Sequence, residues 1–184
     1  MPISAVKPIY LIVLALVILS VVINRINNPY RKYSSSEYWQ TASVQSVADI
    51  PDQAIIEKNK NGPVLMWAAI GASDPEILVE LVRRGADINE SDGIFAGTPL
   101  TGAAGYSKYP DMIDKLIELG ADIGKTVHGG DTALIIAARY NEHPGIITAL
   151  IRNGAKRNRK NSSGKTALDV AKRAENETAI MELQ

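Results

Sequence analysis

Residues that could carry catalysis or bind a metal are few and far apart in this sequence. The 184 residues include two histidines, His128 and His143, and no cysteine. Neither histidine has a second one three or four positions away to share a metal. The carboxylates are scattered, so no pair is predicted to converge in a pocket for acid–base chemistry. We therefore expect no enzyme activity, no metal and no cofactor.

Two stretches look like phosphate-binding loops, which need a glycine, four further residues and then Gly-Lys-Ser/Thr. The Gly-Lys-Thr at 124–126 lacks the first glycine because Leu119 stands there. The Gly-Lys-Thr at 164–166 lacks it because Arg159 does. Neither stretch follows a predicted strand. We expect no nucleotide and no small-molecule substrate.

The charges cancel in sum but segregate along the chain. With 20 basic and 20 acidic residues the formal net charge is zero, which argues against a general nucleic-acid binder. Residues 49–92 nevertheless carry nine acids and four bases, whereas residues 152–173 carry eight bases and one acid, Asp169. Such a gradient can orient a partner that carries the opposite one. The alternative is that solvated loops are simply charged.

A recurring phrase supplies the elements that would position any site. Thr98, Thr132 and Thr166 repeat at intervals of 34 residues, and each is followed two positions later by leucine. Alanine pairs at 68–69, 103–104 and 137–138 and Gly-Ala at 85–86, 120–121 and 154–155 keep nearly the same spacing. Each unit is typical of a turn, a helix, a loop and a second helix. Stacked copies can bury a core that a single copy cannot.

These motifs resemble the ankyrin repeat family, whose unit of about 33 residues carries a Thr-Pro-Leu-His-x-Ala phrase. The resemblance covers roughly residues 61–184 and includes Gly-Ala-Asp-x-Asn at 85–89. The residues at the family's histidine position are Met66, Thr101, Ile135 and Asp169, which puts its usual loop-bracing hydrogen bond in question. The resemblance implies an all-α ankyrin-repeat solenoid of about four helix-turn-helix units, at 61–92, 93–128, 129–161 and 162–184, the last a C-terminal cap.

Prolines and glycines predict where the second helix of each unit begins and ends. Proline is favoured in the first turn of a helix, so prolines 75, 110 and 144 are expected to start these helices. Glycine is favoured just past a helix end, where a left-handed residue is needed, so glycines 85, 120 and 154 are expected to end them. Residues 37–60 are expected to form the N-terminal capping helices.

An uncharged apolar run at residues 9–23 opens the chain. Together with Pro8 and Asn24 it reaches about 17 residues, the lower limit for a spanning helix. We expect an uncleaved anchor within residues 1–24, touching the membrane through 8–24, and a linker at 25–36. A cleaved signal peptide and a buried helix are the alternatives. The repeats are expected to face the periplasm from a bacterial inner membrane, or alternatively the cytoplasm, because the flanking basic residues are nearly balanced.

Four aromatic residues, Tyr30, Tyr33, Tyr38 and Trp39, lie close together after the anchor. Their rings are expected to lie at the level of the lipid headgroups. The alternative is that they belong to a tether without a specific role.

Partner-binding residues are expected on the loops between units, the fingers of the family, and on its concave face. The finger at 92–97 is apolar between glycines, and its Phe95 is the only phenylalanine, so it is a candidate interface anchor unless it folds back under the array. The expected set comprises Ile70, Glu90, Asp92, Ile94, Phe95, Tyr106, Lys125, His128, Arg139, Tyr140, Arg157 and Arg159.

The sequence thus predicts a membrane-tethered module that binds another protein, with no nucleic acid and no small molecule as partner. Anchored arrays of this size resemble immunity or accessory proteins for a secreted or envelope protein. The alternative is an architectural spacer at the membrane surface without a specific partner site.

Overall fold

The computed structural model describes residues 30–56, 62–92 and 97–184. The expected anchor at 8–24 lies outside these residues, as do Ile94 and Phe95. Among the described residues no helix has the length and apolar character needed to cross a membrane. The chain divides into two compact units, Met1–Lys32 and Tyr33–Gln184, and the second unit carries the helical array.

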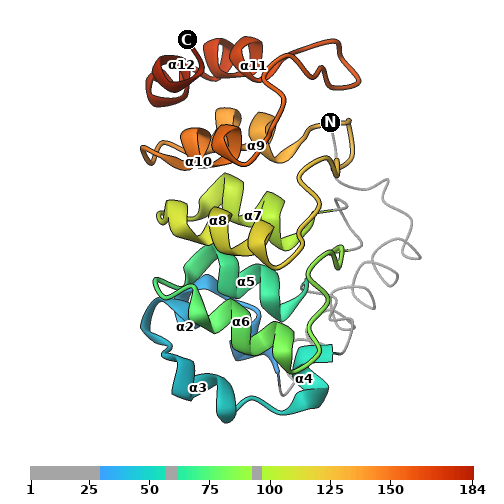
Figure 1. Ribbon diagram of the computed structural model, residues 1–184, viewed down its shortest axis with the longest axis vertical. Helices are drawn as coiled ribbons and strands as arrows, with labels where there is room; N and C mark the ends of the chain where they lie inside the picture. Colours follow the sequence, from blue (N-terminus) through green and yellow to red (C-terminus); the bar gives the residue numbers. More distant parts are fainter. Residues whose placement is uncertain (1–29, 57–61, 93–96) are drawn as a thin grey trace, which may run out of the picture. The chain divides into compact units, whose positions relative to one another are not determined.

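The second unit is built from pairs of short helices stacked one on the next (Figure 1). One column, called here the inner column, consists of α2 (Ser36–Thr41), α5 (Val64–Gly71), α7 (Pro99–Tyr106), α9 (Ala133–Tyr140) and α11 (Ala167–Ala174). The outer column consists of α3 (Val44–Ala48), α6 (Glu76–Arg83), α8 (Pro110–Glu118), α10 (Ile146–Arg152) and α12 (Glu177–Leu183). A 3-10 turn, η1 (Arg31–Tyr33), and the short α4 (Asp52–Ile56) complete the helices of the described residues. Those residues contain no strand, which confirms the expected all-α solenoid for them.

Threonines of the repeated phrase start the inner helices. The side chains of Thr98, Thr132 and Thr166 each accept a hydrogen bond from a backbone N–H three residues on, as N-cap residues do. Two residues at the family's histidine position complete this bracing. The Thr101 hydroxyl accepts a bond from the Thr98 N–H at 2.7 Å, and an Asp169 carboxylate oxygen accepts one from the Thr166 N–H at 3.0 Å. A capping box replaces the histidine in these two units.

The outer helices follow the proline and glycine signals with one exception. Pro75 immediately precedes α6 and Pro110 is the first residue of α8. Pro144 does not start α10, which begins at Ile146 because Gly145, at φ +88°, turns the chain first. At the far ends Gly85, Gly120 and Gly154 have φ of +100°, +97° and +97°, so the predicted left-handed terminations are confirmed.

Buried asparagines tie one inner helix to the next. Asn141 follows α9, and its Nδ2 donates to the carbonyl oxygens of Ala104 and Ser107 in the preceding unit, both at 2.9 Å. Asn176 follows α11 and repeats the arrangement one unit further along, donating to the Asn141 carbonyl oxygen at 2.8 Å. The carbonyl groups that a helix leaves unpaired at its C-terminal end are thereby satisfied across the unit boundary.

Helices α2 and α3 take the place of a repeat although they lack its motifs. Trp39 is fully buried, and its Nε1 donates to the Tyr33 carbonyl oxygen at 2.9 Å. A Cβ at Gly71 would overlap the Ser36 carbonyl oxygen, so only glycine lets α2 lie this close to α5. Tyr33 is also buried. These two rings therefore belong to the core of the array. For Tyr33 and Trp39, the expectation that they lie at the lipid headgroups is wrong, and so is the alternative that they belong to an incidental tether.

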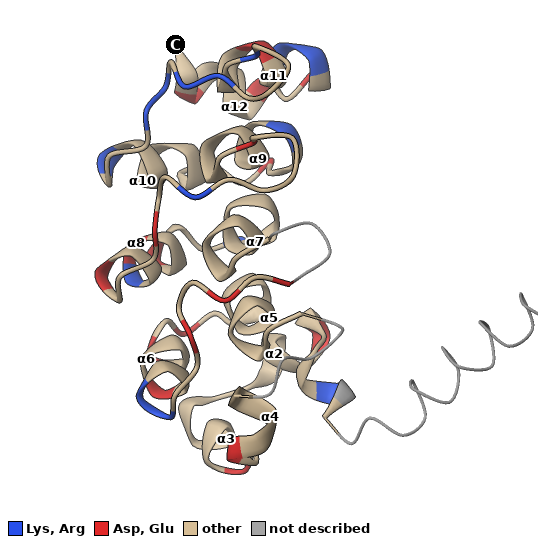
Figure 2. Ribbon diagram, turned by 90° about the vertical axis from the view of Figure 1, so that its right-hand side faces the viewer, with Lys and Arg blue, Asp and Glu red and all other residues tan. Residues whose placement is uncertain are grey.

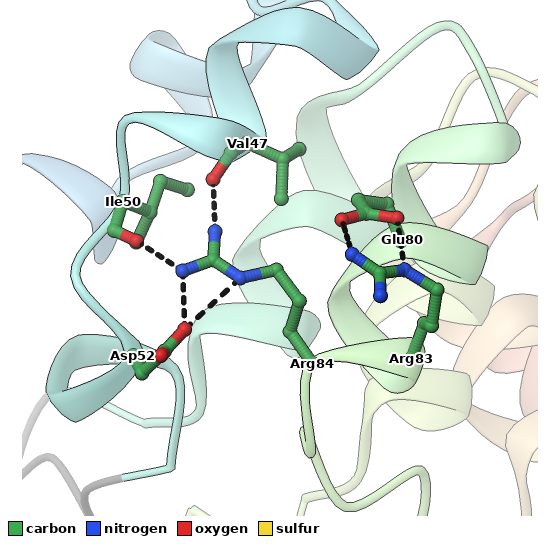
Figure 3. A network of polar contacts seen from close by, with 6 residues as sticks. All are labelled: Val47, Ile50, Asp52, Glu80, Arg83 and Arg84. Atoms are coloured by element: carbon green, nitrogen blue, oxygen red, sulfur yellow. Dashed lines mark hydrogen bonds and ion pairs between the residues drawn. The ribbon is translucent and has the colours of Figure 1, made fainter.

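Arg84, just beyond α6, fastens α3 and α4 to the rest of the array (Figure 3). Its guanidinium donates to the carbonyl oxygens of Val47 and Ile50 and to the Asp52 carboxylate. The Arg84 side chain is 14% exposed, so its bonds to the two carbonyl oxygens are partly shielded from water, whereas the Asp52 side chain is 74% exposed. Its neighbour Arg83 points elsewhere and pairs with Glu80 at the surface, at 2.6 Å.

Candidate protein-interaction surface

Two tyrosines stand out on the exposed side of the inner column, called here the inner face. Tyr106 and Tyr140 are the last residues of α7 and α9 and occupy the same place in successive units. Their rings stack with centroids 5.9 Å apart and planes inclined by 23°. The two residues are 58% and 53% exposed, which leaves much of this aromatic surface open to solvent. We call them the tyrosine pair.

Two buried glycines of α7 let side chains of the neighbouring inner helices pack close to it. A Cβ at Gly102 would lie 3.2 Å from Cδ1 of Ile70, and one at Gly105 would lie 3.1 Å from Cγ2 of Ile136. The two isoleucines lean towards the glycines from α5 and α9 and are half-buried. Ile70 therefore packs against α7 and is only partly open to solvent.

Arg139 is held beside the tyrosine pair by an ion pair and by an aromatic ring. Its Nη2 donates to Oδ2 of the buried Asp131 at 2.6 Å, and its guanidinium carbon lies 5.8 Å from the centroid of the Tyr140 ring. The other Asp131 oxygen accepts a bond from Nδ2 of Asn161, also at 2.6 Å. The guanidinium is thus preorganised, and its charge is balanced within the same unit.

Tyr106 keeps its hydroxyl proton in this setting. Partial burial, with a smaller contribution from Tyr140, raises the pKa of Tyr106 above its usual value. A neutral phenol can donate one hydrogen bond and accept others, while its ring offers apolar area. The tyrosine pair can therefore contact a protein through both apolar and polar groups.

The predicted partner-binding residues do not all lie at this surface. The structure brings together Tyr106, Arg139 and Tyr140, and it places Ile70 against Gly102 of α7. His128 and Arg159 are exposed on two successive fingers. Arg157 donates from Nη1 to the carbonyl oxygen of Leu183 at 3.2 Å, which places it beside α12. Ile94 and Phe95 are outside the described residues, so Phe95 stays a prediction.

Some predicted finger residues hold the fingers together. Lys125 donates from Nζ to the carbonyl oxygen of Asn89 at 2.8 Å, and the Asn89 side chain bonds to Gly120 and Asp122 in the next unit. Asp92 accepts a bond from the Gly97 N–H at 3.1 Å and closes the base of its own finger. Glu90, on the same finger, is half-buried.

Asp131 and Asn161 are not among the residues that the sequence pattern predicts for this surface. Asp131 precedes the N-cap threonine of α9, and Asn161 belongs to the following finger, yet their side chains meet. The available signal was an acidic residue eight positions before a predicted surface arginine. That spacing joins a finger to the far end of a helix, so local periodicity does not reveal it. Across the described ranges no three metal-binding side chains gather.

The charge gradient read from the sequence is carried into the fold (Figure 2). Basic residues concentrate at the end of the stack formed by α11 and the finger before it, while acidic residues are frequent around α6 and the finger after it. The tyrosine pair lies between these regions, on α7 and α9. A partner running the length of the stack would pass acidic, aromatic and basic regions in turn.

Comparisons with known proteins agree with this architecture. Residues 100–183 match the family model described as ankyrin repeats, in three copies. A mouse protein, ankyrin repeat and SOCS box protein 6, is 33% identical over 81 residues, which are 42% of this chain and 19% of the mouse protein. The chain thus spans less than a fifth of that relative's length. Together with the helix pairs, threonine caps and glycine terminations, this match identifies residues 100–183 as ankyrin repeats.

Proposed function

We propose that this chain is a membrane-tethered module that binds a partner protein through the tyrosine pair, Arg139 and the neighbouring fingers. Ankyrin repeats are generally protein–protein interaction modules. The observation that carries the proposal is the stacked and half-open tyrosine pair, placed midway along the inner face.

The chemistry of the tyrosine pair suits recognition of a protein surface. Tyrosine offers a large rigid area and a hydroxyl, and its two side-chain torsions cost little entropy when they are fixed. Here the rings already support each other, and Arg139 lies over one of them. Residues fixed before binding lose less freedom on association, so more of the contact energy appears as affinity. Tyrosine and arginine are also enriched among residues that dominate binding energy.

Site-specific photocrosslinking tests the proposal by trapping whichever protein covers the tyrosine pair. A benzoylphenylalanine introduced at Tyr106 or at Tyr140 in the full chain, in cells that make it, should crosslink to one and the same protein. The matched control is the same group at Met181, which is 69% exposed on α12. Failure to obtain a shared adduct at the two tyrosine positions, or the same adduct at Met181, would contradict the proposal.

A double variant separates this proposal from a purely architectural role. Once crosslinking has identified the partner, the variant with both Tyr106→Ala and Tyr140→Ala should no longer capture that protein in an affinity pull-down. Both anchors are then removed while the buried core is untouched. A spacer without a partner site would be unaffected by the same change. Circular dichroism of the double variant should match the parent, since both side chains are largely solvent-exposed.

The tether part of the proposal rests on the apolar run at residues 9–23. We propose that it anchors the chain in a bacterial inner membrane with the repeats on the periplasmic side, where an immunity or accessory role towards a secreted or envelope protein would place them. Protease added to intact spheroplasts should then digest a C-terminal tag. A tag that stays protected until the membrane is lysed would show the opposite orientation. Release of the tagged chain from membranes by carbonate extraction would show that it is not anchored.

A further inference from the structure

The third and fourth units carry the same arginine on the inner face but differ in the residue that faces it. Arg139 and Arg173 occupy equivalent places in α9 and α11, 34 residues apart. The place of Asp131, which neutralises Arg139, is taken in the fourth unit by Lys165. The two helices start alike, since their N-cap residues Thr132 and Thr166 have φ and ψ of −80° and 169° and of −80° and 170°. An ion pair in one unit has become a pair of like charges in the next.

Further cations surround this pair of like charges. Arg159 and Lys160 lie on the same finger as Lys165, whose carbonyl oxygen accepts a bond from the Asn161 N–H at 3.0 Å, and Lys172 precedes Arg173. All five side chains are exposed, and within the described part of the chain none of them forms an ion pair. These residues, Arg159, Lys160, Lys165, Lys172 and Arg173, are called here the basic cluster.

One carboxylate close to two of these cations, Asp169, is already engaged. Asp169 accepts hydrogen bonds from the N–H and the hydroxyl of Thr166, at 3.0 and 2.8 Å. These bonds are the main reason that its pKa lies below the usual value, and Lys165 and Lys172 lower it further. Asp169 is thus committed to capping α11. The positive charge of the basic cluster is left to face solvent or a ligand.

We propose that the basic cluster binds an acidic segment, rich in aspartate and glutamate, of the same partner protein that covers the tyrosine pair. The inference rests on the proposed function and adds the chemistry of the partner. Charge complementarity supports it, since exposed arginine and lysine side chains gathered at one end of the stack pair well with carboxylates. The segment would run from the tyrosine pair towards the C-terminal end of the inner face, where the cations stand.

A nucleic acid suits this surface less well than a peptide. Single strands are held by aromatic rings that stack on bases beside the cations. In the fourth unit the place of Tyr106 and Tyr140 is taken by Ala174, so the basic cluster has no such ring from α11. A polyanion that continued along the stack would also meet the excess of acids in residues 49–92. A short acidic stretch flanked by uncharged residues avoids that repulsion.

Binding of a labelled peptide to the full chain in detergent micelles tests the proposal. The probe is a short glutamate-rich peptide with one leucine, and its nearly isosteric analogue with glutamine in place of glutamate is the neutral control. Fluorescence anisotropy should show saturable binding of the acidic peptide only. The affinity should fall as salt is raised, because exposed charges are screened within about 8 Å at physiological ionic strength.

Lys165→Asp is the decisive variant because it restores the arrangement of the third unit, in which an aspartate neutralises the arginine. It should weaken binding of the acidic peptide by about tenfold or more. Lys108→Asp makes the same change in net charge at an exposed site between α7 and α8, outside the basic cluster, and should leave the affinity within about twofold. Arg173→Gln, a smaller change, should weaken binding even if Lys165→Asp perturbs the fold.

Three outcomes would overturn the proposal. These are equal weakening by Lys165→Asp and Lys108→Asp, absence of binding by the parent chain, and tighter binding of a single-stranded oligonucleotide of the same charge. None of these outcomes affects the shared crosslink at Tyr106 and Tyr140. Failure of the acidic-segment proposal can therefore be told apart from failure of the proposed function. If that crosslink were absent while peptide binding was intact, the basic cluster would still bind acidic peptides. The claim that the acidic segment belongs to the protein covering the tyrosine pair would then be wrong.

Discussion

The two ends of the stack reach the same arrangement by different means. At the N-terminal end α2 and α3 have no repeat motif and are held by a buried Trp39, the close approach at Gly71 and the Arg84 bonds. At the C-terminal end α11 and α12 keep the motif and are held by polar groups. Glu182 of α12, for example, accepts bonds from the N–H groups of Gly145 and Thr148 at 2.9 and 2.8 Å.

The difference shows that a place in the stack matters more than a motif. Each unit contacts mainly its neighbours, so any helix pair that fills the groove and satisfies the neighbouring carbonyl groups can extend the array. One large ring and one arginine accomplish this at the N-terminal end, whereas a repeated asparagine and a capping glutamate do so at the C-terminal end. The N-terminal end should therefore depend on few residues and the C-terminal end on many.

Trp39→Ala should have the largest effect, because it removes a fully buried ring from the smallest helix pair. Loss of a buried tryptophan costs about 3 to 5 kcal/mol. In hydrogen exchange, amides of α2 and α3 should lose protection while those of α9 to α12 keep it, since the distant units do not share the contact. Gln40→Ala, at an exposed neighbour, is the control. Uniform loss of protection along the array would mean that the ends are not independent.

Arg84→Ala should follow in size and can be compared directly with Arg83→Ala. Removing Arg84 takes away the donor that reaches the carbonyl oxygen of Ile50, and an unsatisfied buried polar group costs about 1 to 3 kcal/mol. Arg83 forms only an exposed pair with Glu80, so its removal should leave the urea midpoint unchanged. Equal shifts for the two variants in urea unfolding would show that Arg84 does not fasten the N-terminal end.

Glu182→Ala should have a smaller effect at the C-terminal end. The carboxylate caps the first turn of α10 from the next unit, and loss of a helix cap costs about 1 kcal/mol. Thermal unfolding should show a modest decrease in Tm, with Glu142→Ala, at an exposed loop position, as the control. A decrease as large as that of Trp39→Ala would contradict the view that the C-terminal end shares its stability among many polar contacts.

Asp169 should give the smallest effect, and it should depend on pH. Hydrogen bonds from the backbone and the hydroxyl of Thr166, and then the nearby lysines, hold the pKa of Asp169 below its unfolded value. Its contribution to stability is therefore present above the unfolded pKa and is lost as the pH falls through the folded pKa. The difference in urea midpoint between the parent and Asp169→Asn should be present at neutral pH and shrink below about pH 4. A difference that grows in acid would contradict this.

Much of the fold could be read from the sequence because its signals are local. Thr98, Thr132 and Thr166 cap helices through bonds to residues three positions on, and Gly85, Gly120 and Gly154 end helices through their own φ. Such signals act within one turn of chain, so a repeated phrase determines a repeated helix pair. The prediction that a helix begins at Pro144 was wrong, because Gly145 adopts a left-handed conformation and α10 begins only at Ile146.

Of the candidate surface, the sequence by itself determined the residue types and their period, which placed Tyr106, Arg139 and Tyr140 on one face. Only the tertiary structure decided that the rings stack, that Asp131 neutralises Arg139, and that Trp39 is core. The physical reason is distance along the chain. A cap or a turn is fixed by neighbours a few residues away, whereas burial and charge pairing depend on which side chains the packed helices bring together.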